Sequence, residues 1–378
     1  MARDEKKPAI RFAGFTDPWE QRKLGDEADI LAGGDVDKSK LSEKGRYPVI
    51  ANALTGDGIV GYYDDEYRIK APAVTVTGRG DVGHAQARIV DFTPVVRLLS
   101  VKSAHDVNFL ENAINNHKVV IESTGVPQLT APQLSKYQIW FASPDEETRI
   151  GAFFMNLNNL ITLHQRKCDK LISVKKSMLE KMFPQKGAKV PEIRFAGFTD
   201  PWEQRKLKDI ATFINGRAYS QDELLSVGKY KVLRVGNFYT NDSWYYSDME
   251  LGEKYYANYG DLLYTWSATF GPHIWIGDKV IYHYHIWKVE LSEQFDKMFA
   301  VQILEYDREK ITSDSNGSTM IHVTKKGMEE KSISMPSVPE QKRIGKFLEN
   351  LDNLITLHQR KLEKLKNIKK SLLEKMFV

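Results

Sequence analysis

The sequence has little of what several classes of protein require. It contains one cysteine in 378 residues, which excludes a disulfide framework and fits a reducing cytosol. No apolar run approaches the roughly 18 residues of a membrane span, and the first ten residues have no apolar core of a secretory signal. We therefore expect a cytoplasmic protein, with no membrane partner. Its length predicts two or three domains, and 42% hydrophobic residues are enough for real cores.

Motifs for catalysis and cofactor binding are also scarce. The sequence has no Walker A lysine motif, no HExxH, no GxSxG and no cysteine spacing typical of metal ligands. Residues 56–61 and 78–83 fit GxGxxG, but a dinucleotide site needs that pattern between a strand and the helix that it opens. Both are followed here by residues typical of turns and strands. We expect no catalytic residue, no metal site and no cofactor in this chain.

What the sequence does have is an internal duplication. Residues 10–24 read IRFAGFTDPWEQRKL and recur letter for letter at 193–207, 183 positions later. Residues 149–183 recur with substitutions at 343–377, 194 positions later. The intervening segments therefore differ in length, and they show no obvious similarity to each other. A constant segment, a variable segment and a second constant segment thus occur in this order twice. This pattern predicts a frame, made of the constant segments, that is present twice and carries two unlike domains.

The repeats also predict the domain boundaries. Short β-type runs between glycine turns, among them 95–99 and 119–121, favour strands in both variable segments, and 106–115 and 293–305 look like short helices. We expect an α+β fold with two globular mixed α/β domains. The predicted parts are a constant N-terminal segment at 1–26, a first domain at 27–142, a long helix at 143–183, a linker with the repeated segment at 184–209, a second domain at 210–336 and a second long helix at 337–378.

The two constant helices carry a heptad pattern. Each opens with a proline and acidic residues, which suit a helix N-terminus, and each lacks Gly and Pro after Gly151 or Gly345. A helix of about 35 residues is roughly 50 Å long. The apolar spacing of four and three is that of helices that pack along their length. We expect the two to form an antiparallel coiled coil with a pseudo-two-fold axis, with a seam at Leu157, Ile161, His164, Leu171, Met178, Leu351, Ile355, His358, Leu362, Leu365 and Leu372.

Other residues on these helices have structural interpretations. His164 and His358 lie on the seam in identical NLITLHQRK strings, and we interpret them as polar residues that fix the register rather than as metal ligands. Cys168 stands where the other copy has leucine, so we interpret it as a packing residue. A second ridge of Leu160, Leu354 and Ile368 is expected to widen the apolar stripe.

Charge is distributed unevenly along the chain. Residues 149–190 hold nine Lys and Arg against two acidic residues, and 343–378 hold nine against four. The variable segments are mildly acidic, with 12 basic against 14 acidic residues in 27–138 and 13 against 17 in 210–332. Basic helices can follow a phosphate backbone, but lysines also simply solubilise long helices. Charge alone leaves both interpretations open.

Local features of the variable segments suit contact with DNA. The glycine-rich loop 77–84 carries an arginine and a histidine, and 123–128 and 315–319 fall at like places in the two copies. Arg, Asn, Gln and Ser are side chains that read base edges, although ordinary tight turns explain these segments equally well. The candidate DNA-binding residues are Thr77, Arg79, His84, Ser123, Thr124, Gln128, Arg217, Tyr219, Ser315, Asn316 and Ser318.

These motifs together resemble the specificity subunit of a type I restriction-modification system. The matching residues are FAGFTDPWEQRKL at the head of each copy, and PEQKRIGKFLENLDNLITLHQRKLEKL with SLLEKMF at the end of the second. The first copy departs from the pattern at 145–148, where it reads DEET. The resemblance covers the whole chain.

The resemblance implies two target recognition domains, each of which reads one half of a bipartite, asymmetric sequence in double-stranded DNA, with the helix pair setting the spacer. It implies assembly with two adenine-methylating subunits and, for cleavage, two ATP-driven restriction subunits. S-adenosylmethionine, ATP and Mg²⁺ would belong to those partners, so this chain would not be an enzyme. One alternative is a scaffold whose coiled coil joins two protein-binding domains. A methyltransferase is a weaker alternative, because no S-adenosylmethionine site is visible.

Overall fold

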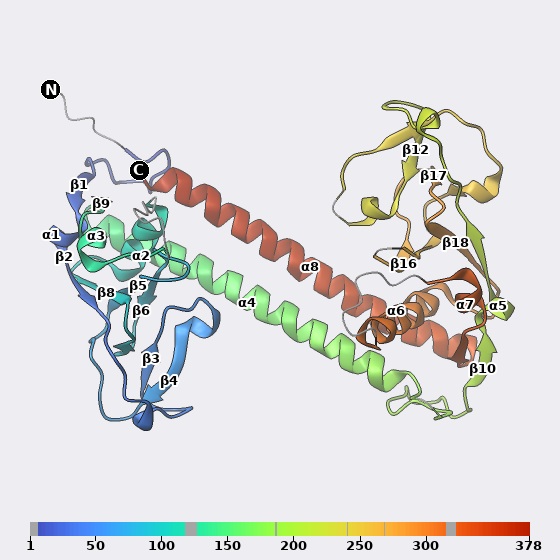
Figure 1. Ribbon diagram of the computed structural model, residues 1–378, viewed down its shortest axis with the longest axis horizontal. Helices are drawn as coiled ribbons and strands as arrows, with labels where there is room; N and C mark the ends of the chain where they lie inside the picture. Colours follow the sequence, from blue (N-terminus) through green and yellow to red (C-terminus); the bar gives the residue numbers. More distant parts are fainter. Residues whose placement is uncertain (1–6, 118–126, 186, 240, 268, 315–322) are drawn as a thin grey trace. The chain divides into compact units, whose positions relative to one another are not determined.

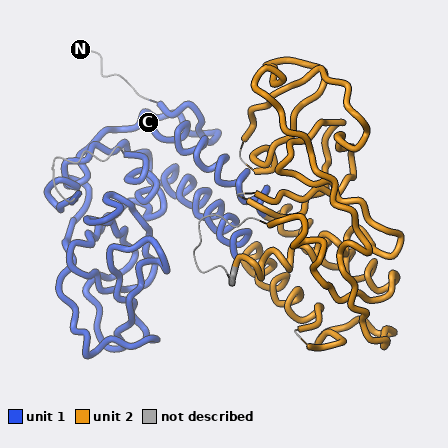
Figure 2. Tube along the Cα trace, turned by 45° about the vertical axis from the view of Figure 1, so that its right-hand side comes forward, with its two compact units in different colours: residues 1–166, 359–378 blue, residues 167–358 orange. Residues whose placement is uncertain are grey.

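The computed structural model describes residues 7–117, 127–185, 187–239, 241–267, 269–314 and 323–378. The chain divides into two compact units, shown in Figure 2. Unit 1 comprises 1–166 and 359–378, and unit 2 comprises 167–358. Two long helices, α4 (Pro144–Met182) and α8 (Val338–Met376), each contribute one half to each unit (Figure 1). The unit boundary thus falls within both helices and not at their ends.

The globular part of unit 1 is built on short, mostly antiparallel strands. The strand at the end of the repeated segment pairs with the strand just before α4, and two further sheets with three short helices form the rest. The two-stranded pair is β1 (Glu20–Lys23) and β9 (Gln138–Phe141). The four-stranded sheet has the order β2 (Ala28–Ala32), β8 (Leu98–Ser103), β5 (Ala73–Thr77), β6 (Ala85–Arg88), and the three-stranded sheet has the order β4 (Ile59–Tyr63), β3 (Tyr47–Ile50), β7 (Thr93–Pro94). The helices are α1 (Leu24–Glu27), α2 (Val107–Asn116) and α3 (Ala131–Ser135).

Unit 2 repeats this arrangement with a different sequence. Its two-stranded pair is β10 (Glu203–Lys206) and β19 (Ser332–Met335); one sheet runs β11 (Ala211–Asn215), β18 (Ile286–Leu291), β15 (Leu262–Thr265), β16 (Gly271–Ile274); the other runs β13 (Tyr245–Ser247), β12 (Tyr230–Leu233), β17 (Val280–Tyr282), β14 (Tyr256–Ala257); and the helices are α5 (Leu207–Ile210), α6 (Lys297–Asp314) and α7 (Lys325–Glu329). The central sheets correspond strand for strand. The duplication therefore extends to the fold of the variable domains, although their sequences do not reveal it.

The long helices pack antiparallel, as the heptad pattern and the duplication together predict. In unit 1, Leu157 and Ile161 of α4 share a core with Leu365 and Leu372 of α8. The first half of α4 therefore meets the last half of α8. In unit 2, the second half of α4 and the first half of α8 share a core that includes Leu171, Met178, Leu348 and Leu351.

The predicted seam residues are all at least half-buried, whereas the second ridge is not. Among the seam residues Leu157, Leu351 and Leu362 are buried, and the others are intermediate. Leu160, Leu354 and Ile368 are 46%, 44% and 38% exposed. The expectation that this ridge widens the packed stripe is wrong, because its three residues are exposed and belong to neither of the two cores that the helices share.

The repeated segment has a specific structural role. In unit 1, the backbone N–H of Ile10 donates to the carbonyl oxygen of Lys375, near the end of α8, at 3.0 Å. Arg11 donates from Nε and Nη2 to the two carboxylate oxygens of Glu146, in the first turn of α4. The segment thus fastens the end of one helix to the start of the other. Trp19, which is buried, adds a hydrogen bond from its Nε1 to Glu146 at 3.1 Å.

Unit 2 contains the same fastening with the helices exchanged. Ile193 donates to the carbonyl oxygen of Lys181, near the end of α4, at 2.9 Å. Arg194 donates to both carboxylate oxygens of Glu340, at the start of α8. The isoleucine and the arginine of each copy thus make the same two attachments, one to the end of one long helix and one to the start of the other.

Some expected elements differ in extent. The helix expected at 293–305 begins only at Lys297, because Asp296 caps it by accepting from the N–H groups of Met298 and Phe299. The run at 95–99 was expected to be a strand. Residues 96–97 form a turn instead, and β8 starts only at Leu98. The expected strand at 119–121 lies outside the described residues.

Candidate nucleic-acid interface

In unit 1, three backbone segments meet at one end of the central sheet: the turn 94–97 that precedes β8, the loop 78–84 that follows β5, and residues 127–129. The N–H of Leu129 donates to the carbonyl oxygen of Gly78 at 2.9 Å, and that of Gly34 donates to Pro94 at 3.2 Å. Loops held on a sheet in this way are common sites of binding residues.

Two glycines allow these segments to approach closely. A Cβ added to Gly33 would lie 2.2 Å from the carbonyl oxygen of Val95, and a Cβ added to Gly78 would lie 2.2 Å from that of Arg97. Any side chain at either position would displace the turn. The turn 94–97 is therefore held between two backbone segments.

Asn52 joins the turn and the loop. Its side-chain oxygen accepts from the N–H of Gly78 at 2.8 Å, and its side-chain nitrogen donates to the carbonyl oxygen of Val96 at 3.2 Å. Because one amide satisfies both segments, the loop and the turn are fixed relative to each other within unit 1.

The structure brings several predicted residues to this end of the sheet. Arg79 and Gln128 face each other in an isolated antiparallel bridge, and both are exposed, as is His84. The structure does not support the predicted DNA contact of Thr77. It is 6% exposed, and its hydroxyl donates to the carbonyl oxygen of Asp81 and accepts from the N–H of His84. Its side chain shapes the loop and does not face a ligand.

Sequence reasoning missed Arg97. This residue is exposed and has a positive φ of 71°. It follows two valines, and such a run is typical of a strand, so the sequence carries no signal for a turn here. The positive φ became visible only in the structure.

The same end of the sheet in unit 2 presents different side chains. Thr265 pairs with Ile286 as Thr77 pairs with Leu98, so Trp266 occupies the position of Gly78 and His285 that of Arg97. Trp266 donates from Nε1 to the carbonyl oxygen of Tyr284, which is 40% exposed, at 2.8 Å. Burial lowers the pKa of the neighbouring His283 to about 4, so this ring is neutral near pH 7.

Arg217 and Tyr219 lie beside these residues, but Arg217 is already engaged. Its Nη1 and Nη2 donate to the carboxylate of Glu223 at 3.0 and 2.6 Å, and its guanidinium lies 5.2 Å from the Tyr219 ring. Burial raises the pKa of Tyr219. The side chains of Arg217 and Tyr219 are therefore held against other residues of the domain and do not extend from its surface. The candidates Ser123, Thr124, Ser315, Asn316 and Ser318 lie outside the described residues.

The glycine motifs lack the context of a dinucleotide site. Residues 56–61 form a 3₁₀ turn that leads into β4, and 78–83 form the loop between β5 and β6. Within the described residues no group of three or more His, Cys, Asp or Glu side chains could hold a metal ion. No helix in the described part of the chain is long and apolar enough to cross a membrane.

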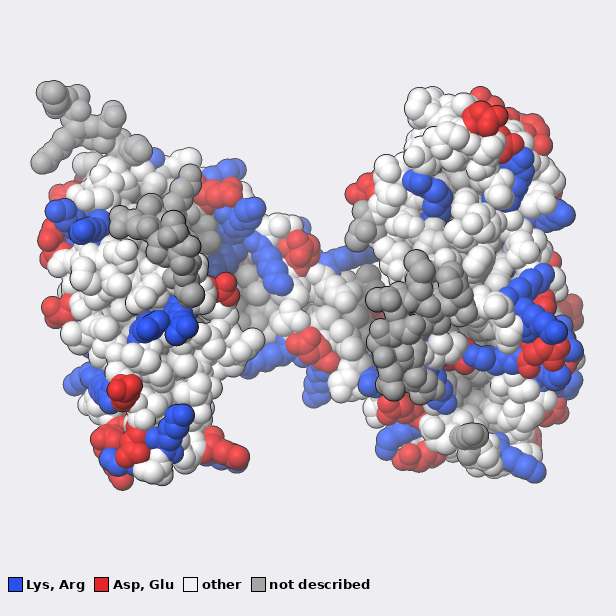
Figure 3. All heavy atoms as spheres, viewed as in Figure 1, with Lys and Arg blue, Asp and Glu red and all other residues white. Residues whose placement is uncertain are grey.

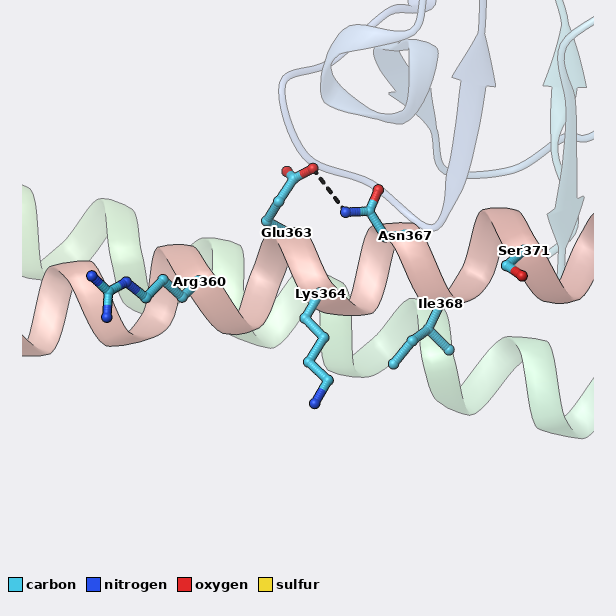
Figure 4. Close-up of a pocket in the computed structure, with 6 residues that line it drawn as sticks. All are labelled: Arg360, Glu363, Lys364, Asn367, Ile368 and Ser371. Atoms are coloured by element: carbon cyan, nitrogen blue, oxygen red, sulfur yellow. Dashed lines mark hydrogen bonds between the residues drawn. The ribbon is translucent and has the colours of Figure 1, made fainter. Parts of the chain in front are cut away.

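Charge on the surface is mixed. On the face drawn in Figure 3, Lys and Arg alternate with Asp and Glu over both units and form no single large basic field. A depression along α8 is lined by Arg360, Glu363, Lys364, Asn367, Ile368 and Ser371. Figure 4 shows that the lining side chains come from one helix, with Asn367 donating to Glu363 at 3.3 Å. Such a surface is open and encloses no small molecule.

Comparison with known proteins places these features in a family. The family model described as "Type I restriction modification DNA specificity domain" matches residues 16–172 and again 199–367. A type I restriction enzyme specificity subunit of Methanocaldococcus jannaschii is 22% identical over 94% of this chain and 91% of that protein. A putative type I specificity subunit of Mycoplasma pneumoniae is 32% identical, over 34% of this chain and 37% of that protein, so this chain matches about a third of its length. The crystal structure of a type I restriction-modification S subunit from M. genitalium has a TM-score of 0.71 at 14% identity and covers 99% of both chains, which establishes the fold.

Proposed function

Because the chain belongs to the type I restriction-modification DNA specificity family, we propose that it is the subunit that selects the DNA sequence for such a complex. Each globular domain reads one half of a bipartite, asymmetric target. The observation that carries this proposal is the family match in two copies, one over each half of the chain.

The equivalent ends of the central sheets in unit 1 and unit 2, described above, support the reading of two different half-sites. The domains share one topology but present unlike side chains at equivalent positions, with Arg97 in unit 1 where unit 2 has His285. A DNA backbone is two-fold symmetric, so a pseudo-two-fold protein can dock in the same way on both half-sites. Because the two domains present different side chains on the same pair of helices, the two half-sites differ and the recognised sequence is asymmetric.

The helix pair has two roles in this proposal. Since α4 and α8 both pass from one unit into the other, their length sets the spacer between the half-sites. Their exposed leucines bind partner subunits. Leu160 and Leu163 are 46% and 47% exposed, and their equivalents Leu354 and Leu357 are 44% and 45% exposed. Apolar residues repeated on a soluble surface mark interaction sites, and two equivalent sites fit two adenine-methylating subunits.

Chemistry belongs to the partners in this proposal. The adenine-methylating subunits would bind S-adenosylmethionine, and two restriction subunits would use ATP and Mg²⁺. The chain itself is non-catalytic and acts on cytoplasmic DNA.

Methylome sequencing of a restriction-deficient host that expresses this chain with its modification subunit tests the proposal. The expected result is one bipartite motif with methyladenine on opposite strands in the two halves. A continuous palindrome or no motif would reject it. A scaffold that joins two protein-binding domains would give no motif and would leave duplex DNA unbound.

A further inference from the structure

Arg97 occupies a backbone position that its side chain does not suit. The carbonyl oxygen of Val95 accepts from the N–H of Leu98 at 3.0 Å, which makes Arg97 the third residue of a tight turn. Its φ of 71° is the value that a type II turn requires there, and glycine is preferred because it has no Cβ. A non-glycine residue in this conformation costs roughly 1–2 kcal/mol.

The Arg97 side chain makes no polar contact with the described part of the fold in return. The side chains of Arg79 and Arg97 make no ion pair or hydrogen bond with any described residue. Other arginines of the chain do make them, because Arg11, Arg194 and Arg217 each hold a carboxylate. Backbone strain that the fold does not use is typical of binding sites.

The two arginines are carried on segments fixed against each other. Gly78, which precedes Arg79, packs on the carbonyl oxygen of Arg97, and Asn52 bonds to both segments. Gln128 lies opposite Arg79 and is exposed. Both guanidinium groups therefore project from one rigid end of unit 1, as base-reading residues must.

We infer that Arg97, next to Arg79, reads a guanine in the half-site that unit 1 recognises. This inference rests on the proposed function and names a base and a residue within it. A guanidinium can donate two parallel hydrogen bonds to O6 and N7 of guanine in the major groove, a pattern that no other base offers. Unit 2 has His285 at this position, and its Arg217 is paired with Glu223, so the requirement is confined to one half-site.

The test is the methylation motif of Arg97 variants in the restriction-deficient host described above. Arg97→Ala removes the guanidinium, and Arg97→Gly also removes it while suiting the positive φ, so a loss of reading in both cannot come from backbone strain. We expect one G·C position in one half-site to relax, with discrimination there reduced about 5- to 150-fold, while the other half-site stays unchanged. Arg79→Ala should affect the same half.

His285→Ala, at the equivalent position of unit 2, is the matched control and should leave that G·C position intact. An unchanged motif in both Arg97 variants would overturn the inference. So would an even loss of methylation at all sites with no relaxed position, which would indicate a phosphate contact. If the unaltered chain gives no bipartite motif, the proposed function fails instead, and that outcome is seen before any variant is compared.

Discussion

The guanidinium of Arg11 donates to both carboxylate oxygens of Glu146, with Nε and Nη2 each 2.7 Å from the oxygen that it meets. The carboxylate is fully buried and the guanidinium side chain is 13% exposed. Together they join the repeated segment to the first turn of α4. Arg194 and Glu340 do the same in unit 2.

We expect Arg11→Met to destabilise unit 1 by about 3 kcal/mol, because it leaves a buried carboxylate without its cation. The measurement is urea unfolding followed by tryptophan fluorescence. Replacing both partners, as in Arg11→Met with Glu146→Met, should recover most of the loss. Lys40→Ala is the control, since Lys40 pairs with the exposed Glu66 and such pairs contribute less than about 1 kcal/mol. Equal losses in Arg11→Met and Lys40→Ala would contradict this role.

The stability of unit 1 should depend on pH through His105. Hydrogen bonds to Glu147 and then to Glu27 raise the pKa of His105 above its ordinary value, against the opposing effect of burial. Glu27 is in turn paired with Arg22. The stabilising charge is complete below about pH 6.5, the ordinary value, and is lost as the pH rises through the higher pKa of the folded protein. Thermal unfolding between pH 6 and 9 should show this decline.

Unit 2 supplies the matched control for this prediction. The counterpart of Glu147 is Gln341, which donates to two carbonyl oxygens and accepts from Asp296 N–H. The residue before that aspartate is Phe295, as His105 stands before the capping Asp106. Glu147→Gln should therefore reduce the pH dependence of unit 1, because only the smaller contribution of Glu27 to the pKa of His105 then remains. A decline of unchanged size in this variant would show that another group is responsible.

Helix length should set the spacer of the DNA target. Inserting one heptad after Thr162 and one after Thr356, which are exposed, adds about 10 Å to each helix, or about three base pairs at about 3.4 Å each. We expect a longer spacer with both half-sites preserved, read by methylome sequencing. The same spacer in the altered chain would count against this role of the helices.

The exposed leucines should bind modification subunits without contributing to the fold. Leu160→Glu with Leu163→Glu should remove one of two bound subunits and leave thermal unfolding nearly unchanged, because both side chains are close to half exposed and belong to neither core. Native mass spectrometry of the reconstituted complex measures the stoichiometry. Ile89→Glu, at a residue that is 78% exposed on the globular part of unit 1, is the control and should retain both. Full assembly of the double variant would exclude this surface.

The sequence predicts the long helices and their packing far better than it predicts the fold and the binding residues of the two variable domains. Seam residues such as Leu157 and Leu351 repeat every three or four positions, and this periodicity predicts that the helices pack along their length. The duplication of two equal units around one linker predicts that they are antiparallel. The common topology of the two variable domains is not predictable in this way, since short strands of unlike sequence give no shared pattern. Arg97 could not be found either, because a positive φ follows from contacts with Gly33 and Gly78, far away in sequence. Thr77 has a suitable residue type but a buried hydroxyl, which only three-dimensional packing decides.

The linker at 184–192 joins the end of α4 to the repeated segment of unit 2, whereas in unit 1 the end of α8 is held to the same segment by non-covalent contacts such as that between Ile10 and Lys375. Both junctions have the same geometry, so the frame does not depend on the order in which its parts are translated. At the level of the gene, recombination within the two repeated segments can therefore exchange one variable domain for another while both attachments to the helix ends are kept. A chain altered in this way would read one new half-site and keep the other.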